Sequence, residues 1–331
     1  MKRILTLAAI ATLAVVGIPS VAAAHGDRGC PAPAAQQSAV SAAVADGLDT
    51  RSCDAVTTVR EDGVGVEIPE AGYGVVAIAI GDDGTETALT VTTSPDGVVD
   101  VETQEHAATG DEGVETEGHA ATTSATTTAT VNRCSDTSHA LLGGKWFSTP
   151  TFMVNSTERR PSNISEANWE IVVGDALRTI TTGADGCSLS PTPSATGVTR
   201  MNQLGDANIS STNTCTSTDS VSVVDFGSLS GTPLALTCVS FVFGTDQIRA
   251  ADLRIDNSNV SWVTSVSGCT GTKYDLRSTL THEFGHAFGL GHAVERGGND
   301  LTMSPSVTAC NSSARYLGLG DLRGLLALYP N

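Results

Sequence analysis

The segment LTHEFGHAFGLGHAV gathers three of the chain's seven histidines within eleven residues. Because His282 and His286 stand four residues apart, a helix would project both imidazoles from one face, where they can hold one metal ion. Glu283 lies about a quarter-turn away, where it suits a general base acting on metal-bound water better than a third ligand. Gly289 permits a sharp turn that returns the chain with His292 as the third ligand. The segment therefore predicts a zinc site whose fourth position is open for catalysis.

The helix expected to carry these histidines has signals at both ends. Asp275 is the expected N-cap, and Gly289 is expected to end the helix in the left-handed conformation. A second helix is expected from the N-cap Ser165 to about Thr182, because apolar residues recur there at intervals of three and four and define one buried face. The apolar residues of that face are Trp169, Val172, Val173, Ala176 and Ile180.

Strands are expected on both sides of the second helix, in short runs rich in β-branched and aromatic residues. The expected strands are residues 64–68, 74–80, 149–155, 221–226, 234–243 and 250–255. Extended peptides often bind by adding a strand to an exposed sheet edge. We expect a substrate strand to add at such an edge near residues 250–255.

The histidine segment matches the pattern H-E-x-x-H-x-x-G-x-x-H at all five fixed positions. It resembles the active-site segment of metzincin zinc endopeptidases, and most closely that of the matrixin branch in the form found in secreted bacterial proteins. Met303 in LTMSP resembles the methionine of the family's Met-turn, and LGLGDLRGLLALY near the C-terminus resembles its closing helix. ADLRID, ahead of Trp262, is similar to the strand before the active-site helix. The resemblance covers about residues 134–331.

The resemblance implies an α+β fold of the zincin type. In that fold a mixed, twisted β-sheet packs on an N-terminal helix and an active-site helix, followed by a Met-turn and a C-terminal helix. His282, His286 and His292 are the implied ligands of one Zn²⁺, with Met303 beneath the metal. Glu283 is the implied catalytic residue, which assists attack of zinc-bound water on peptide bonds of a protein or peptide substrate. The alternative is a secreted, non-catalytic binding protein on a metzincin scaffold.

Two further features of the site stay open at this point. Residues 304–318, after the Met-turn, are expected to shape the specificity pocket. A bound Ca²⁺ is open as an additional ion, but no ligands are assigned to it. Many matrixins hold a structural zinc through extra histidines, but only His139 lies outside the triad in the expected catalytic domain. A second, histidine-held zinc is therefore not expected.

The eight cysteines all lie beyond residue 24 and form no CxxC pair, which favours disulfides over a zinc-finger or redox role. Spacing alone leaves roughly a hundred connectivities open. The resemblance to bacterial matrixins implies the pairs Cys134–Cys187, Cys215–Cys238 and Cys269–Cys310, which leaves Cys30–Cys53 as an N-terminal pair. With Cys134 bonded, a cysteine thiolate is not expected to cap the zinc.

Composition divides the chain into four parts. Residues 1–24 have the basic start, the apolar run and the small terminal residues of a secretory signal peptide. Residues 25–102 are acidic and β-rich, and we expect them to form a propeptide or an accessory region. Residues 103–130 form a low-complexity Thr/Ala/Glu linker without apolar periodicity. Residues 131–331 are the expected metzincin catalytic domain.

Charge and hydropathy limit the kinds of partner that this chain can have. The net charge is −18, and residues 25–130 alone carry 19 acidic side chains against three Arg. A chain this acidic lacks the basic surface that nucleic-acid binding needs. No apolar run after the signal reaches membrane-spanning length. We therefore expect a secreted, extracellular monomer that spans no membrane after signal removal.

Overall fold

The computed structural model describes residues 39–53, 56–81, 86–106, 132–216, 219–293 and 301–331. The expected signal peptide lies outside these residues, as do Cys30 and residues 107–130 of the expected linker. Among the described helices, none is both long and apolar enough to cross a bilayer.

Strands occur throughout the described residues, and three of the four described α-helices lie in the second half of the chain. The described strands are β1 (Ala39–Ser41), β2 (Thr58–Glu61), β3 (Val64–Glu67), β4 (Tyr73–Gly81), β5 (Glu86–Thr93), β6 (Val99–His106), β7 (Ala140–Leu141), β8 (Thr151–Val154), β9 (Val198–Arg200), β10 (Thr214–Cys215), β11 (Ser222–Gly227), β12 (Pro233–Val242), β13 (Ile248–Asp256), β14 (Trp262–Val263), β15 (Tyr274–Asp275) and β16 (Leu290–Gly291). The helices are α1 (Ala42–Ala45), α2 (Glu166–Thr182), α3 (Leu276–Ala287) and α4 (Leu319–Leu328), with a 3₁₀ turn η1 at Ser313–Arg315.

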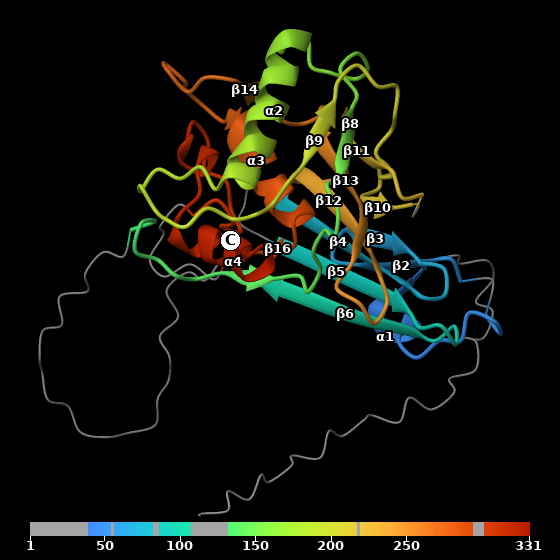
Figure 1. Ribbon diagram of the computed structural model, residues 1–331. Coiled ribbons are helices and arrows are strands. Elements are labelled where there is room, and N and C mark those ends of the chain that lie inside the picture. The colour runs from blue at the N-terminus through green and yellow to red at the C-terminus, as the bar shows by residue number, and fades with distance from the viewer. Residues whose placement is uncertain (1–38, 54–55, 82–85, 107–131, 217–218, 294–300) are drawn as a thin grey trace, which may run out of the picture.

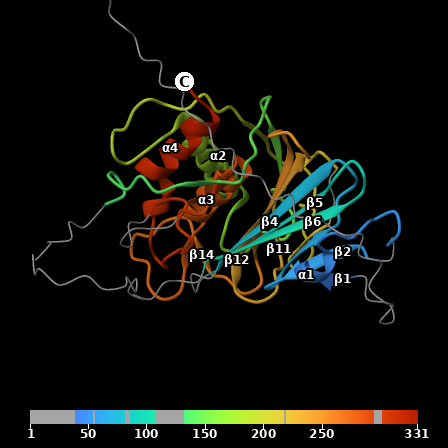
Figure 2. The same cartoon turned by 90° about the horizontal axis from the view of Figure 1, so that it is seen from below.

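One mixed sheet forms the centre of the molecule, with strand order β6-β5-β4-β12-β13-β11-β8-β9. Strands β13, β11, β8 and β9 run parallel to one another, whereas β12 is antiparallel to both β13 and β4. Helices α2 and α3 lie on one face of this sheet. A smaller sheet with order β1-β2-β3-β10 lies with α1 on the other face (Figures 1 and 2). The mixed α+β architecture agrees with the predicted fold class at this level.

Helix α2 forms where the apolar spacing predicts it. The side chain of Ser165 caps the helix by accepting a backbone N–H hydrogen bond from the first turn at 3.2 Å. Gly183 ends the helix in the left-handed region, with φ of 62°. The predicted apolar face is buried, and the ring of Trp169 packs on Phe226 of β11 with their centroids 4.5 Å apart. Through this contact α2 packs against the central sheet.

Two apolar cores lie on opposite faces of the central sheet, and β12 contributes to both. Ala235 and Val239 pack in the core beneath α2 and α3, whereas Leu236 and Cys238 face the core shared with the smaller sheet. This alternation follows from the two-residue period of a strand. Because both faces are covered, most of β12 is buried.

The N-terminal strands are built into the same central sheet. Strand β4 pairs antiparallel with β12 along its whole length, from Tyr73 opposite Val242 to Gly81 opposite Pro233. Strand β6 pairs with β5 and continues to His106, four residues into the segment expected to be a linker, because backbone pairing needs no apolar periodicity. Strands before and after the expected boundary near residue 131 therefore share one sheet.

The predicted substrate edge at residues 250–255 is wrong, because this segment lies inside the sheet. It belongs to β13, which pairs with β11 on one side and β12 on the other. Ala251, Leu253 and Ile255 are fully buried. An apolar strand composition is typical of an interior strand with both faces covered, and it does not specify which neighbours the strand has.

Disulfides connect distant loops and strands. The structure contains Cys134–Cys187, Cys215–Cys238 and Cys269–Cys310, with Cα–Cα distances of 5.4, 5.8 and 5.5 Å. These are the same three pairs that the resemblance to bacterial matrixins implies. Cys53 is also disulfide-bonded, but its expected partner Cys30 lies outside the described residues.

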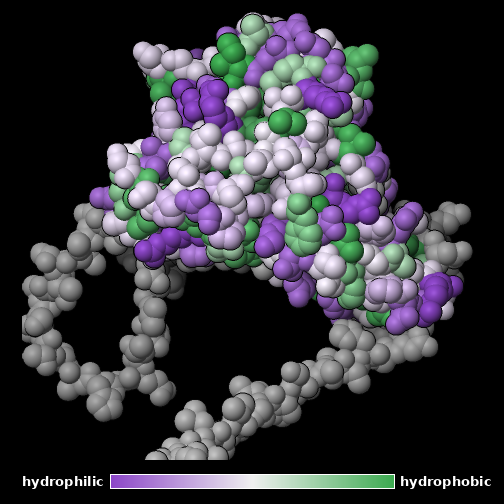
Figure 3. Space-filling model, viewed as in Figure 1, coloured by the Kyte–Doolittle hydropathy of each residue, from purple (hydrophilic) through white to green (hydrophobic). Residues whose placement is uncertain are grey.

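Apolar residues do not gather in one patch on the face that Figure 3 shows. Large exposed apolar side chains include Phe147, Ile171 and Leu204, which are well separated along the chain. Single apolar side chains of this kind are usual on protein surfaces and indicate no specific function.

Candidate metal centre

Helix α3 carries His282, Glu283 and His286, and its ends follow the predicted signals. The carboxylate of Asp275 accepts hydrogen bonds from the backbone N–H and the hydroxyl of Ser278, at 2.8 and 2.9 Å. Nε of Arg315 also donates to Asp275, at 2.8 Å. After the helix, Gly289 has φ of 92° and turns the chain into β16. A side chain at that turn would collide with the carbonyl oxygen of Gly144, which lies 2.0 Å from an ideal Cβ.

The three predicted metal ligands converge on one point. Nε2 of His282 lies 2.7 Å from Nε2 of His292, and Nε2 of His286 lies 2.9 Å from each of them. All three rings are buried. Among the described residues, these three histidines are the His, Cys, Asp or Glu side chains that lie close enough together, three or more at one place, to hold a metal ion.

Backbone carbonyl groups orient two of the rings. Nδ1 of His282 lies 2.7 Å from the carbonyl oxygen of Thr302, and Nδ1 of His286 lies 2.8 Å from that of Leu290. To donate to these oxygens, each Nδ1 carries the hydrogen, which leaves the Nε2 lone pair directed at the shared point. Burial lowers the pKa of both imidazoles well below the ordinary 6.5, so the rings are neutral. Three converging imidazole nitrogens, two of them on rings that burial keeps neutral, are a donor set that fits Zn²⁺.

Glu283 contacts strand β12 from the same helix. Its Oε2 accepts a hydrogen bond from the hydroxyl of Thr237 at 2.5 Å, and both side chains are fully buried. Its other carboxylate oxygen, Oε1, has no hydrogen-bond partner. Burial raises the pKa of Glu283 to about 8, and the bond from Thr237 opposes this rise. A carboxyl group with a pKa near neutrality can both accept and donate a proton near pH 7.

Met303 lies against the middle of α3 at Gly285, a position that the histidine pattern leaves unspecified. An ideal Cβ on Gly285 would stand 2.2 Å from Sδ of Met303. Only glycine therefore lets the thioether approach the helix backbone this closely. The glycine itself is the sequence signal for this contact. A glycine inside a helix lowers the stability by about 0.5–1 kcal/mol relative to alanine, so its presence indicates that a side chain packs closely against it.

A buried carboxylate connects the Met303 turn to α4. Oδ2 of Asp321 accepts hydrogen bonds from the backbone N–H groups of Thr302 at 2.8 Å and Gly318 at 2.7 Å, and Oδ1 accepts from Met303 at 3.0 Å. Since the carbonyl oxygen of Thr302 orients His282, α4 supports a metal ligand through one intervening residue. Helical spacing alone places Asp321 near the start of a helix and does not show this contact.

A pocket of about 190 Å³ lies beside the Met303 turn. Hydroxyl groups are frequent in its lining, which comprises Ser278, Leu301, Thr302, Ser304, Ser306, Val307, Thr308, Asn311, Ser313 and Ala314. The segment 304–318, expected to shape a specificity pocket, supplies most of these residues.

No curated protein and no solved structure matches this chain. Residues 230–330 match the family model described as Matrixin. The matched stretch includes β12, β13, α3, Met303 and α4, and thus the histidine cluster with the elements that support it. The match confirms the resemblance that the histidine pattern predicted: residues 230–330 of this chain are similar to matrixins, which are zinc metalloproteases.

Proposed function

We propose that the protein is a secreted, monomeric zinc endopeptidase that hydrolyses peptide bonds in protein or peptide substrates. The observation that carries this proposal is the convergence of three histidine Nε2 atoms, two from the helix that also bears Glu283 and the third from His292, directly after β16. This helix lies in the stretch that matches the matrixin model. The disulfides, together with the lack of a membrane-spanning helix among the described residues, support an extracellular location.

His282, His286 and His292 would hold Zn²⁺ through their Nε2 atoms. When bound, zinc supplies a Lewis acid that lowers the pKa of water and polarises the substrate carbonyl. Glu283 accepts the proton of the attacking water and then delivers it to the leaving nitrogen. The carbonyl oxygen of Thr302 keeps the His282 ring in place throughout.

We further propose that residues 25–102 are a propeptide that keeps the site closed. Strand β4 covers the edge of β12, where Ile78 stands opposite Thr237, the residue that contacts Glu283. Apolar residues of the N-terminal strands also share a core with the back of the central sheet, which holds them in place. An extended substrate cannot pair with this edge of β12 while β4 occupies it.

The test compares the chain before and after specific cleavage in the linker. A site for a sequence-specific protease is placed within residues 107–130, the chain is cut, and the N-terminal fragment is separated in mild denaturant. Circular dichroism then verifies that the remaining part keeps its fold, and zinc content and casein cleavage are measured. We expect one zinc per chain throughout and casein cleavage only after separation.

Glu283→Ala and chelator treatment provide the controls. Both should abolish casein cleavage, and Glu283→Ala should retain its zinc. Zinc bound without cleavage in the folded, separated protein would refute the endopeptidase and favour the non-catalytic binding protein. Cleavage by the uncut chain would refute only the propeptide role and favour an accessory region.

A further inference from the structure

We infer that Thr237 is a positioning residue for Glu283, which holds one carboxylate oxygen so that the other is kept for proton transfer. The inference rests on the proposed function, because it assigns a role within the same site. Thr237 lies on β12 and Glu283 on α3, so their contact joins the sheet to the active-site helix. The motif that predicts Glu283 gives no indication of Thr237, which is 46 residues away in the chain.

The two oxygens of the Glu283 carboxylate have different surroundings. Oε2 accepts the Thr237 hydroxyl at 2.5 Å, at the short limit for an O–H donor bonded to a carboxylate. Oε1 is buried and has no partner. A buried carboxylate oxygen without a partner is unfavourable for folding and needs an explanation. An oxygen that accepts a proton from water and delivers it to the leaving nitrogen supplies that explanation, because a permanent partner would compete with the reaction.

The strand holds the Thr237 hydroxyl in a constant place. Thr237 stands opposite Ile78 of β4 and Leu253 of β13, so its backbone lies between two paired strands. Its β-branched side chain has few rotamers, and it is fully buried. Rotating the Glu283 carboxylate would break the bond to Oε2, so the same contact also sets the direction of Oε1. Removal of the N-terminal strands would take away β4, which is one neighbour of Thr237, but Thr237 and Glu283 would both remain to form the hydrogen bond.

The test replaces Thr237 in the separated, active protein. Thr237→Val keeps the shape of the side chain and removes its hydroxyl, whereas Thr237→Ser keeps the hydroxyl. For Thr237→Val we expect kcat on a peptide substrate to fall about 10- to 100-fold with little change in KM, as when a residue that orients a metal-site group is lost. Thr237→Ser should recover most of kcat.

Two readouts besides activity complete this test. Zinc content should match that of the wild type in both variants, which separates loss of positioning from loss of metal. A crystal structure of metal-free Thr237→Val should show the Glu283 carboxylate turned away from β12. Should the valine variant lose stability, Thr237→Ala is measured and interpreted in the same way.

Ser240→Ala is the matched control, because it removes a buried hydroxyl from the other face of the same strand. Ser240 donates to the carbonyl of Ala250 at 3.4 Å, away from Glu283. Unchanged kcat in Thr237→Val, with active wild type, would overturn the inference. An equal loss of kcat in Ser240→Ala would also overturn it. A wild type that binds zinc but cleaves nothing would instead overturn the proposed function.

Discussion

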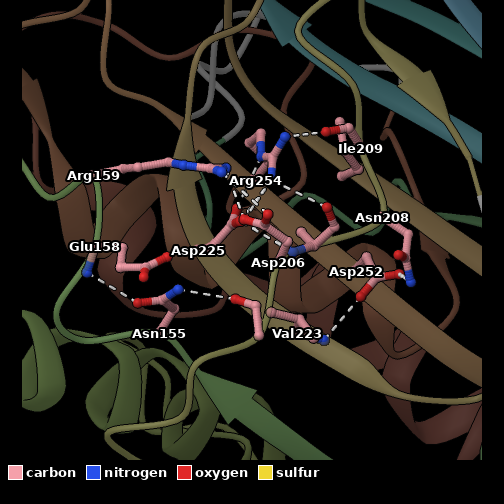
Figure 4. Close-up of polar contacts among 12 residues, drawn as sticks. Asn155, Glu158, Arg159, Asp206, Asn208, Ile209, Val223, Asp225, Asp252 and Arg254 are labelled. Carbon is pink, nitrogen blue, oxygen red and sulfur yellow. Dashed lines mark hydrogen bonds and ion pairs between the residues drawn. The ribbon is translucent and has the colours of Figure 1, made fainter.

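Two buried polar clusters lie on opposite faces of the central sheet, and they differ in how completely their atoms are paired. On the helix face, three histidine Nε2 atoms converge and Oε1 of Glu283 has no partner. On the other face, Arg254 donates to both carboxylate oxygens of Asp225, at 2.9 and 2.6 Å, and to the carbonyl oxygens of Ala207 and Ile209 (Figure 4). Neither Arg254 nor Asp225 has a buried side-chain nitrogen or oxygen without a partner.

The difference separates a cluster suited to chemistry from one that holds the fold. A buried ion pair is tolerated when further hydrogen bonds satisfy its remaining donors and acceptors, as they do around Arg254. Unpaired oxygens and converging lone pairs are unfavourable for folding and persist where a metal or a substrate uses them. Both clusters are buried and hold ionisable groups, so incomplete pairing is what distinguishes the candidate site from the Arg254 cluster.

Glu283→Gln should have the largest effect of the changes considered, and should affect activity alone. The substitution removes the proton-accepting oxygen, keeps the side-chain shape, and leaves an amide oxygen to accept the Thr237 hydrogen bond. We expect kcat to fall by about 10²–10⁴-fold, while the free energy of unfolding changes by about 1 kcal/mol or less. Casein turnover and urea unfolding of one preparation test this. A large loss of stability would contradict the view that Oε1 makes no favourable contribution to the fold.

Arg254→Met should differ from Glu283→Gln, because it should strongly lower the free energy of unfolding and leave zinc binding unchanged. It removes the cation and leaves the Asp225 charge buried with only the backbone N–H of Ala207 as a partner, and the loss of one partner costs about 3–5 kcal/mol in comparable buried pairs. The urea midpoint should fall, while the zinc content of the folded fraction stays unchanged. Adding Asp225→Leu should restore a large part of the stability, because no unpaired charge then remains. A single variant as stable as the wild type would refute the fold-holding role.

Local patterns were sufficient to predict the parts of the site that are close in sequence. The histidine spacing, the cap at Asp275 and the turn at Gly289 depend only on helix geometry, and the structure places all of them on or next to α3. The same holds for α2, whose buried face follows from its apolar period.

The remaining parts depend on which segments become neighbours, and local patterns do not specify that. Thr237 reaches Glu283 from 46 residues away, and Asp321 reaches Thr302 from 19 residues away. The pairing of β4 with β12, and the interior place of β13, follow from long-range register rather than from strand composition. For this reason the substrate edge was predicted on the wrong strand.

Asp321→Asn should have an intermediate effect, in which the free energy of unfolding and the zinc affinity of the helix face both fall. The carboxylate accepts three backbone N–H groups, and an amide would leave at least one of these buried donors unpaired, at about 1–3 kcal/mol. Because Thr302 orients His282, zinc affinity should fall together with stability, unlike in Arg254→Met. Titration against a competing chelator measures this. Wild-type zinc affinity in the variant would show that α4 does not support the ligand.

Asp252 should give the smallest effect, seen as a pH dependence of stability. It lies on the back face, where it accepts the backbone N–H of Val223 at 2.9 Å and the amide of Asn208 at 3.4 Å (Figure 4). Burial raises its pKa from 3.8 to about 8, although these hydrogen bonds oppose the rise. Between about pH 4 and pH 8 the folded protein therefore binds more protons than the unfolded chain, so stability falls as the pH rises through this window.

Asp252→Asn should remove this contribution, because an amide does not titrate while its oxygen can still accept the Val223 N–H. Within the window, each pH unit lowers the wild-type free energy of unfolding by up to about 1.4 kcal/mol through this group. Urea unfolding at pH 5 and pH 6 gives the slope for each protein, and the difference between slopes isolates Asp252, since every other group titrates in both. Parallel slopes would mean that the folded protein keeps Asp252 ionised. The back face would then hold a charge that its hydrogen bonds stabilise fully, which would sharpen the contrast with Glu283.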